Sequence, residues 1–168
     1  MNNKEIQELI SCEKTIVERP KRSFKQNGMH EENSFLLKSF DFPNMKFSVR
    51  MRKHLEFIEN YSIMLASYIP ELEKEIRLIR FNGPHPSMHK NNIINNEKWD
   101  HKSHIHIATK EAIEAGFQAE HYAEITEEYQ IFDDALSLFW EKVNIVDRIE
   151  NFFPEIKQKK LFNIRVLR

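Results

Sequence analysis

Hydrophobic and polar positions alternate most regularly between residues 45 and 52. Met45, Phe47, Val49 and Met51 are apolar, and the positions between them are Lys, Ser or Arg. Successive side chains of a strand point to opposite faces, so this pattern predicts a strand with one face in a core and a cationic face in water. Aromatic and β-branched residues predict further strands over 35–42, 61–68 and 76–81, and a short one over 104–109.

Two stretches have the three- and four-residue spacing of an amphipathic helix. The first covers 3–18 and is closed by Pro20, and the second runs from Phe132 to Val143 with two acids in its first turn. A brief helix is also expected over 111–115, with Thr109 as its N-cap and Gly116 at its end.

The connections between the predicted strands are short, which favours an antiparallel sheet over parallel strands joined by crossovers. The sequence therefore predicts an α+β protein with an antiparallel sheet of four or five strands, packed against the N-terminal helix and the C-terminal amphipathic helix. We expect one domain over 1–153 and a basic C-terminal extension over 154–168, either an edge strand or a loose arm. The polar stretches 21–33 and 84–102 are predicted to be loops.

Composition narrows the classes of protein that remain. The 168 residues carry 25 Lys and Arg against 26 Asp and Glu, so a chain-wide basic field for nucleic acid is excluded, although a local patch is not. No apolar run approaches the ~18 residues of a membrane span, and the first residues lack the apolar core of a signal peptide. With Cys12 as its single cysteine, the chain is expected to be a cytoplasmic protein without membrane contact.

The charges are unevenly placed along the chain. Residues 1–54 hold 11 basic and 7 acidic side chains, whereas residues 110–150 hold 3 basic and 11 acidic ones. This distribution suggests a basic sheet face and an acidic helical side, with ordinary solvated faces as the plainer interpretation. Arg50, Arg52 and Lys53 form the best candidate patch for RNA or DNA.

Histidines cluster in the middle of the chain. Of the eight histidines, five lie between positions 85 and 106. His104 and His106 are two apart on a predicted strand, so their imidazoles point to the same side. His85 follows the strand that ends near Phe81 through a Gly-Pro turn, so all three rings converge if that strand lies beside the strand of His104.

Three interpretations of this cluster remain open. His85, His104 and His106 suit a catalytic Zn²⁺ or Fe²⁺ site, or another divalent metal, completed by Asp100 or Glu111. Without metal, one imidazole acts as base and a second as acid while Arg80 or Arg77 holds a phosphate, which suits RNA cleavage at the 2′-hydroxyl. In the third, the segment is a plain strand with Ile105 and Ile107 in the core and the imidazoles in water.

Three segments carry a resemblance to known families. The strings LIRFNGPH (78–85), HIHIATKEAIEAG (104–116) and the acidic stretch 122–145 resemble an uncharacterised family of small bacterial and mobile-element proteins. The pattern Arg80, Asn82, Pro84 and His85, with His104 and His106 as later histidines, also resembles the TumE-like toxins of toxin–antitoxin systems. That second resemblance implies a toxin-like activity on RNA or on translation.

Two functions of different classes follow. The first is a histidine-dependent, toxin-like nuclease acting on RNA, with His85, His104, His106 and Arg80 as its catalytic residues. The second is a non-enzymatic inhibitor, antitoxin-like or phage-defence protein that binds a cognate protein partner through the acidic region 111–150, with Glu127, Glu128, Asp133 and Asp134 as the sensitive positions.

Overall fold

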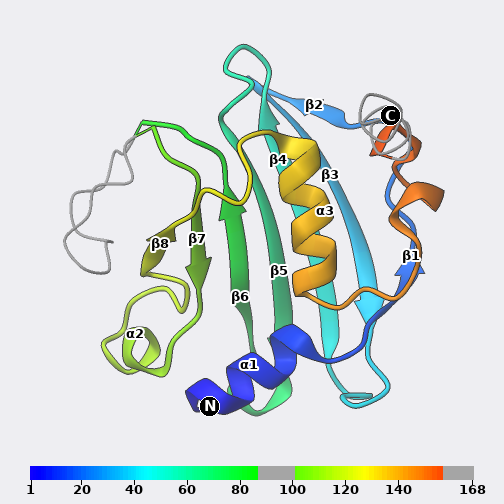
Figure 1. Cartoon of the computed structure of the whole chain (residues 1–168). Helices are drawn as coiled ribbons and strands as arrows, with labels where there is room; N and C mark the ends of the chain where they lie inside the picture. Colours follow the sequence, from blue (N-terminus) through cyan, green and yellow to red (C-terminus); the bar gives the residue numbers. More distant parts are fainter. Residues whose placement is uncertain (87–100, 157–168) are drawn as a thin grey trace, which may run out of the picture.

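An eight-stranded antiparallel sheet, with two helices on one of its faces, forms the body of the protein (Figure 1). This computed structural model describes residues 1–86 and 101–156. The strand order is β1-β3-β4-β5-β6-β7-β8, and β2 pairs with β3 on the same side as β1. The fold class is therefore α+β as predicted, but the sheet has eight strands rather than four or five.

The elements follow one another without long crossovers. The strands are β1 (Thr15–Glu18), β2 (Lys25–Asn27), β3 (His30–Lys38), β4 (Lys46–His54), β5 (Tyr61–Ile69), β6 (Lys74–Asn82), β7 (His104–Ile107) and β8 (Ala123–Ile125). The helices are α1 (Asn3–Ser11), α2 (Lys110–Glu114) and α3 (Phe132–Lys142), with single 3₁₀ turns η1 (Pro70–Leu72) and η3 (Ile149–Asn151).

The extra strands are the short ones. β1, β2 and β8 are three or four residues long, so none shows enough positions for an alternating pattern to be read from sequence. The predicted helix over 3–18 is wrong in its second half: α1 ends at Ser11, and the β-branched run from Thr15 pairs with β3. Likewise, the predicted loop 21–33 is wrong in part, since it contains β2 and the start of β3.

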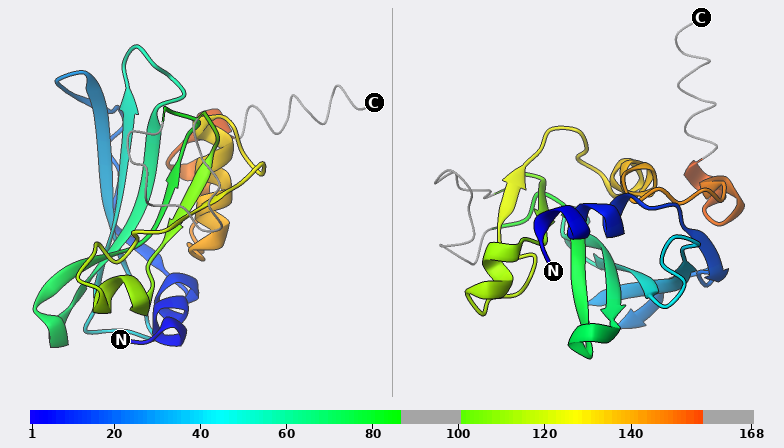
Figure 2. Two further views of the ribbon diagram at one scale, coloured as in Figure 1. Left: turned by 90° about the vertical axis from the view of Figure 1, so that its left-hand side faces the viewer. Right: turned by 90° about the horizontal axis from the view of Figure 1, so that it is seen from below.

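Helices α1 and α3 lie on the same face of the sheet (Figure 2). In α3, Ala135, Leu136, Phe139 and Trp140 are buried, as its spacing predicts. The alternation predicted for β4 is confirmed, since Phe47, Val49 and Met51 are buried in the same core. We call this side the helix face and the opposite side the open face.

A bulge in β6 decides which side chains reach the open face. Leu65 pairs with Ile79 and Ala66 pairs with Arg77, so Leu78 is an extra residue in the ladder. In a regular strand, residues three apart point to opposite faces. With one residue inserted, Arg77 and Arg80 both point to the open face, and both line the cavity found there.

Lys14 joins the C-terminal ends of the two helices. Its side chain is fully buried, and its Nζ donates to the carbonyl oxygens of Ile10 (2.9 Å), Cys12 (2.8 Å) and Val143 (3.1 Å). The last carbonyls of a helix have no partner within the helix, and the helix dipole makes that end attractive to a cation. One ammonium thus satisfies the ends of α1 and α3 together, although burial lowers its pKa.

The remaining predictions concern α2, the C-terminal extension and the loop before β7. The helix α2 has Thr109 as its N-cap, with Oγ1 accepting from the Ala112 amide at 3.2 Å, as predicted. Ile156, placed in the C-terminal extension by the sequence, is buried in the core, and 157–168 lie outside the described residues. The predicted loop 84–102 also falls largely outside them, at 87–100. Across the described residues, no helix combines the length and apolar character needed to cross a membrane.

We expect Lys14→Met to lower the free energy of unfolding by about 2–4 kcal/mol, because it leaves buried carbonyls at two helix ends without donors. Urea denaturation followed by circular dichroism measures this change. Lys4→Met, at an exposed position of α1, is the matched control and should shift stability by less than about 0.5 kcal/mol. Equal midpoints for wild type and Lys14→Met would contradict this account.

Candidate functional site

The predicted histidines line a small cavity of about 290 Å³ on the open face, at the end of β6 and β7. We call it the histidine pocket. Its polar lining comes from six segments of the chain: His30, Arg52, Asn60, Ser62, Arg80, Asn82, His85, His104, His106 and Gln118.

The sequence predicted that the histidines converge if the strand ending near Phe81 lies beside the strand of His104. That pairing is confirmed. β6 runs antiparallel to β7, with Asn82 opposite His104 and Arg80 opposite His106. Directly opposed residues point to the same face, so two histidines, an arginine and an amide meet there. The ring of His104 lies between the other two, with centroid distances of 5.1 Å to His85 and 5.2 Å to His106.

Hydrogen bonds fix which nitrogen carries the proton in the two strand histidines. Nδ1 of His104 donates to the Lys102 carbonyl at 2.9 Å, so its Nε2 accepts from Nδ2 of Asn82 at 3.1 Å. Nδ1 of His106 donates to the Glu120 carbonyl at 3.0 Å, so its lone pair is on Nε2. These bonds hold both rings in one orientation and one tautomer.

Both strand histidines are neutral at pH 7. Burial lowers the pKa of His104 to about 4 and that of His106 to about 3, and the positive charge of Arg80 contributes in each case. His104 has no exposed surface and His106 is 3% exposed. The interpretation that leaves the imidazoles in water is therefore wrong, because both are buried. Its other part holds, since Ile105 and Ile107 are partly buried and pack against the core.

Arg80 is the cation of the pocket. Its guanidinium is mostly buried, and its Nε has no hydrogen-bond partner among the described residues. Burial lowers its pKa, while the nearby carboxylate of Glu120 opposes that shift. That carboxylate accepts from Nη1 of Arg77 at 3.1 Å. The Nε–H of Arg80 can therefore donate a hydrogen bond to a bound anion.

A close backbone approach positions His85. A Cβ on Gly83 would lie 2.0 Å from the Glu59 carbonyl oxygen and 2.6 Å from the Tyr61 ring, so only glycine fits at this position. The Gly83 amide donates to the Tyr61 carbonyl at 3.0 Å, which holds the end of β6 against β5. The turn then brings His85 to the pocket, where it is half-buried and less enclosed than His104.

Of the pocket residues that sequence reasoning missed, two hold a predicted site residue through a hydrogen bond. His30 comes from the start of β3, and its Nδ1 accepts from Nη2 of Arg52 at 3.1 Å. Asn82 was noted only as part of a family pattern, yet its amide holds His104. Asn82 carried a signal, because it alternates with Arg80 along β6. His30 lay in a predicted loop and carried none.

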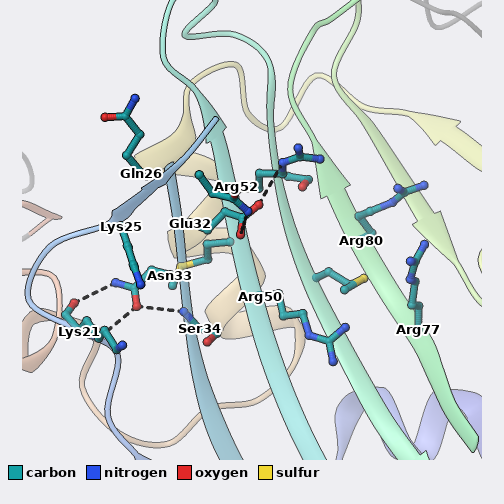
Figure 3. A pocket seen from close by; sticks show the side chains of 14 residues that line it. Lys21, Lys25, Gln26, Glu32, Asn33, Ser34, Arg50, Arg52, Arg77 and Arg80 are labelled. Carbon is teal, nitrogen blue, oxygen red and sulfur yellow. Dashed lines mark hydrogen bonds and ion pairs between the residues drawn. The ribbon is translucent and has the colours of Figure 1, made fainter. Parts of the chain in front are cut away.

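A second, larger cavity of about 840 Å³ lies beside the histidine pocket, and Arg52, Ser62 and Arg80 line both (Figure 3). Of its fourteen lining residues, six are Lys or Arg and one, Glu32, is acidic. Arg50 and Arg52 of the predicted nucleic-acid patch point into it, as β4 alternation requires.

The placement of Lys53 in that patch needs correction. Its Nζ lies 4.0 Å from the Phe24 ring centroid and 5.0 Å from that of Phe132, the first residue of α3, and it pairs with Glu31. Lys53 therefore belongs to the helix face, because alternate residues of a strand point to the same face and Lys53 follows Met51 by two positions.

The described residues do not form the metal site that the sequence predicted. Within 1–86 and 101–156, no group of three or more His, Cys, Asp or Glu side chains is placed to hold a metal ion. Both nitrogens of His104 are already engaged by Asn82 and the Lys102 carbonyl. Glu111 instead accepts from the side chain of Asn3 at 3.1 Å, and Asp100 lies outside the described residues.

Comparison of the chain with protein-family models, with curated proteins and with solved structures finds no match. The resemblances stated from the sequence therefore stay predictions. The chemistry of the open face has to be inferred from its geometry.

We expect the free energy of unfolding to fall as the pH is lowered from 7 to 5. His104 and His106 stay neutral in the folded protein, while in the unfolded chain they take up protons near pH 6.5. The unfolded state then binds more protons than the folded state. Each histidine therefore lowers the folding equilibrium constant by up to about tenfold for each pH unit below 6.5, and has no effect well above that pH.

Urea denaturation at a series of pH values measures this slope. The double variant His104→Asn/His106→Asn should show a shallower dependence between pH 5 and 7, and His121→Asn, outside the pocket, should keep the wild-type slope. A wild-type slope in the double variant would show that the two rings are not held neutral by the fold.

Proposed function

We propose that this protein binds RNA on its open face and cleaves it at the histidine pocket. The observation that carries the proposal is the mostly buried guanidinium of Arg80, whose Nε has no hydrogen-bond partner among the described residues and whose cross-strand neighbour is His106. A cation in that state gains most from an anion that accepts its hydrogen bonds. A phosphate does so in the planar geometry that arginine favours.

The surroundings of Arg80 support a phosphodiester over a simple carboxylate. Arg52 lines the same pocket from β4, on the other side of Ser62, so two guanidinium groups face one small cavity. An imidazole beside a bound phosphate is the arrangement required to move protons at its ester oxygens. RNA is favoured as the substrate because its own 2′-hydroxyl supplies a nucleophile.

The three histidines have different roles in this proposal. His106 presents Nε2 as a base, because its Nδ1–H is donated to the Glu120 carbonyl. His85, at the less enclosed side of the pocket, is the acid. His104 is a positioning residue, since it is fully buried and its ring lies between the other two.

The reaction balances without a further reactant. His106 takes the proton of the 2′-hydroxyl while the 2′-oxygen forms a bond to phosphorus. The bond from phosphorus to the 5′-oxygen breaks, and His85 gives that oxygen a proton. The products are a 2′,3′-cyclic phosphate and a 5′-hydroxyl end. The low pKa of His106 makes it a weak base in the free protein, and a phosphate anion at Arg80 raises that pKa in the complex.

We expect a mixed-sequence RNA oligomer to be cut to products with 2′,3′-cyclic phosphate ends, and the same sequence in DNA to stay intact. Arg80→Met and His106→Asn should each lower kcat/KM by about 100-fold or more. Lys4→Met removes a cation from the helix face and should leave the rate unchanged. Mass spectrometry of the products and circular dichroism of each variant complete the assay. Cutting by folded Arg80→Met and His106→Asn at the wild-type rate would exclude this pocket as the site.

In cells, we expect an RNA-cleaving protein of this kind to arrest growth when its expression is induced in a bacterial host. The His104→Ala/His106→Ala variant should not arrest growth, provided that it accumulates as a folded protein. Arrest by wild type that depends instead on Glu127, Glu128, Asp133 and Asp134 would favour the binding protein that acts through the acidic region 111–150.

A further inference from the structure

We infer that the larger cavity of the open face is a binding track for the backbone of a single-stranded RNA chain that continues beyond the histidine pocket. This inference rests on the proposed function and adds to it a substrate class: an oligomer recognised by its phosphates, rather than a nucleotide or a dinucleotide.

The first argument is continuity. The cavity of about 840 Å³ shares Arg52, Ser62 and Arg80 with the histidine pocket, so the two form one surface. It extends from β6 across β5, β4 and β3 to β2 (Figure 3). From β7 to β2 there are five strand spacings of ~4.8 Å, which gives a path of about 24 Å. A path of that length suits a chain of at least ~4 nucleotides.

The second argument is the set of cations along the path. Arg77 and Arg80 come from β6 through its bulge, and Arg50 and Arg52 come from β4. Three of these four arginines have carboxylate partners, at Glu75, Glu32 and Glu120. Among the described residues, Lys21 and Lys25 at the far end have no ion pair, so they keep their full charge for a ligand.

The third argument is that the fold fixes the position of Lys21. Asn33 is 7% exposed, and its side chain accepts from the Lys21 amide at 3.0 Å and donates to the Lys21 carbonyl at 2.8 Å. A buried amide group thus holds the backbone of an exposed lysine at the edge of the cavity. Figure 3 shows the Lys25 side chain directed toward the same place.

The lining also distinguishes RNA from a protein partner. Its one apolar side chain on the open face is that of Met64, because the Met51 side chain is in the core of the helix face, and no aromatic or branched aliphatic residue is among the fourteen. Protein interfaces depend on buried aromatic and aliphatic anchors, which this surface does not offer. The absence of aromatic platforms from this lining further indicates recognition of the backbone and not of the bases.

The test compares random-sequence RNA pools of 3 and 12 nucleotides, by fluorescence anisotropy at several salt concentrations. Wild type should bind the 12-mers at least tenfold more tightly than the 3-mers. Lys21→Gln/Lys25→Gln should remove most of that advantage and reduce the salt slope for the 12-mers by about 1.4, because each neutralised phosphate of a single strand accounts for ~0.7 of the slope. Its binding and cleavage of the 3-mers should not change.

Lys4→Gln/Lys142→Gln is the matched control, because it removes the same charge from the two helices of the helix face. An equal loss in this control, or no loss in Lys21→Gln/Lys25→Gln, would overturn the track, while cleavage of the 3-mers would leave the proposed function standing. Binding of poly-glutamate but of neither RNA pool would overturn both and assign the face to an acidic protein.

Discussion

The pairing of β6 with β7 is the constraint on which the candidate site depends. It sets His106 against Arg80 and His104 against Asn82, so a strand with two histidines becomes a pocket with a cation and an amide. A slip of β7 by one residue would turn both histidines to the helix face, away from Arg80 and Asn82 and among apolar residues that cannot satisfy them. The bulge at Leu78 adds the second condition, since it brings Arg77 to the same face and leaves Glu120 paired with that arginine.

The sequence predicted those parts of the fold in which apolar and polar residues recur regularly over enough positions to be recognised. β4 and α3 are of this kind, and so is the common direction of His104 and His106, whereas α2 was predicted from its capping residues. Short strands such as β2 showed no pattern, and the β-branched residues of β1 followed the spacing of a helix by coincidence. The patch prediction included Lys53 because nearness in sequence was taken as nearness in space. His30 was missed because only the sheet pairing brings β3 near β6.

The pocket keeps its histidines neutral through burial, and the same burial leaves Arg80 with incomplete hydrogen bonding. Both features cost folding free energy, and the binding of an anion beside Arg80 would reduce both costs. Such a site is organised for its ligand before the ligand binds, so little of the binding free energy is spent on rearranging side chains. In the proposed complex with RNA, the rest of the open face contributes through charge and does not contact the bases.

Lys14 has a consequence for the order in which the chain acquires its structure. Its ammonium bonds the Val143 carbonyl, 129 positions further along the chain, and that acceptor is synthesised after all the strands of the described sheet. Until then, the Lys14 ammonium, just after α1, cannot be buried at low cost. The helix face therefore closes only after the strands have been synthesised, so α1, which precedes them in sequence, is among the last elements to reach its final place.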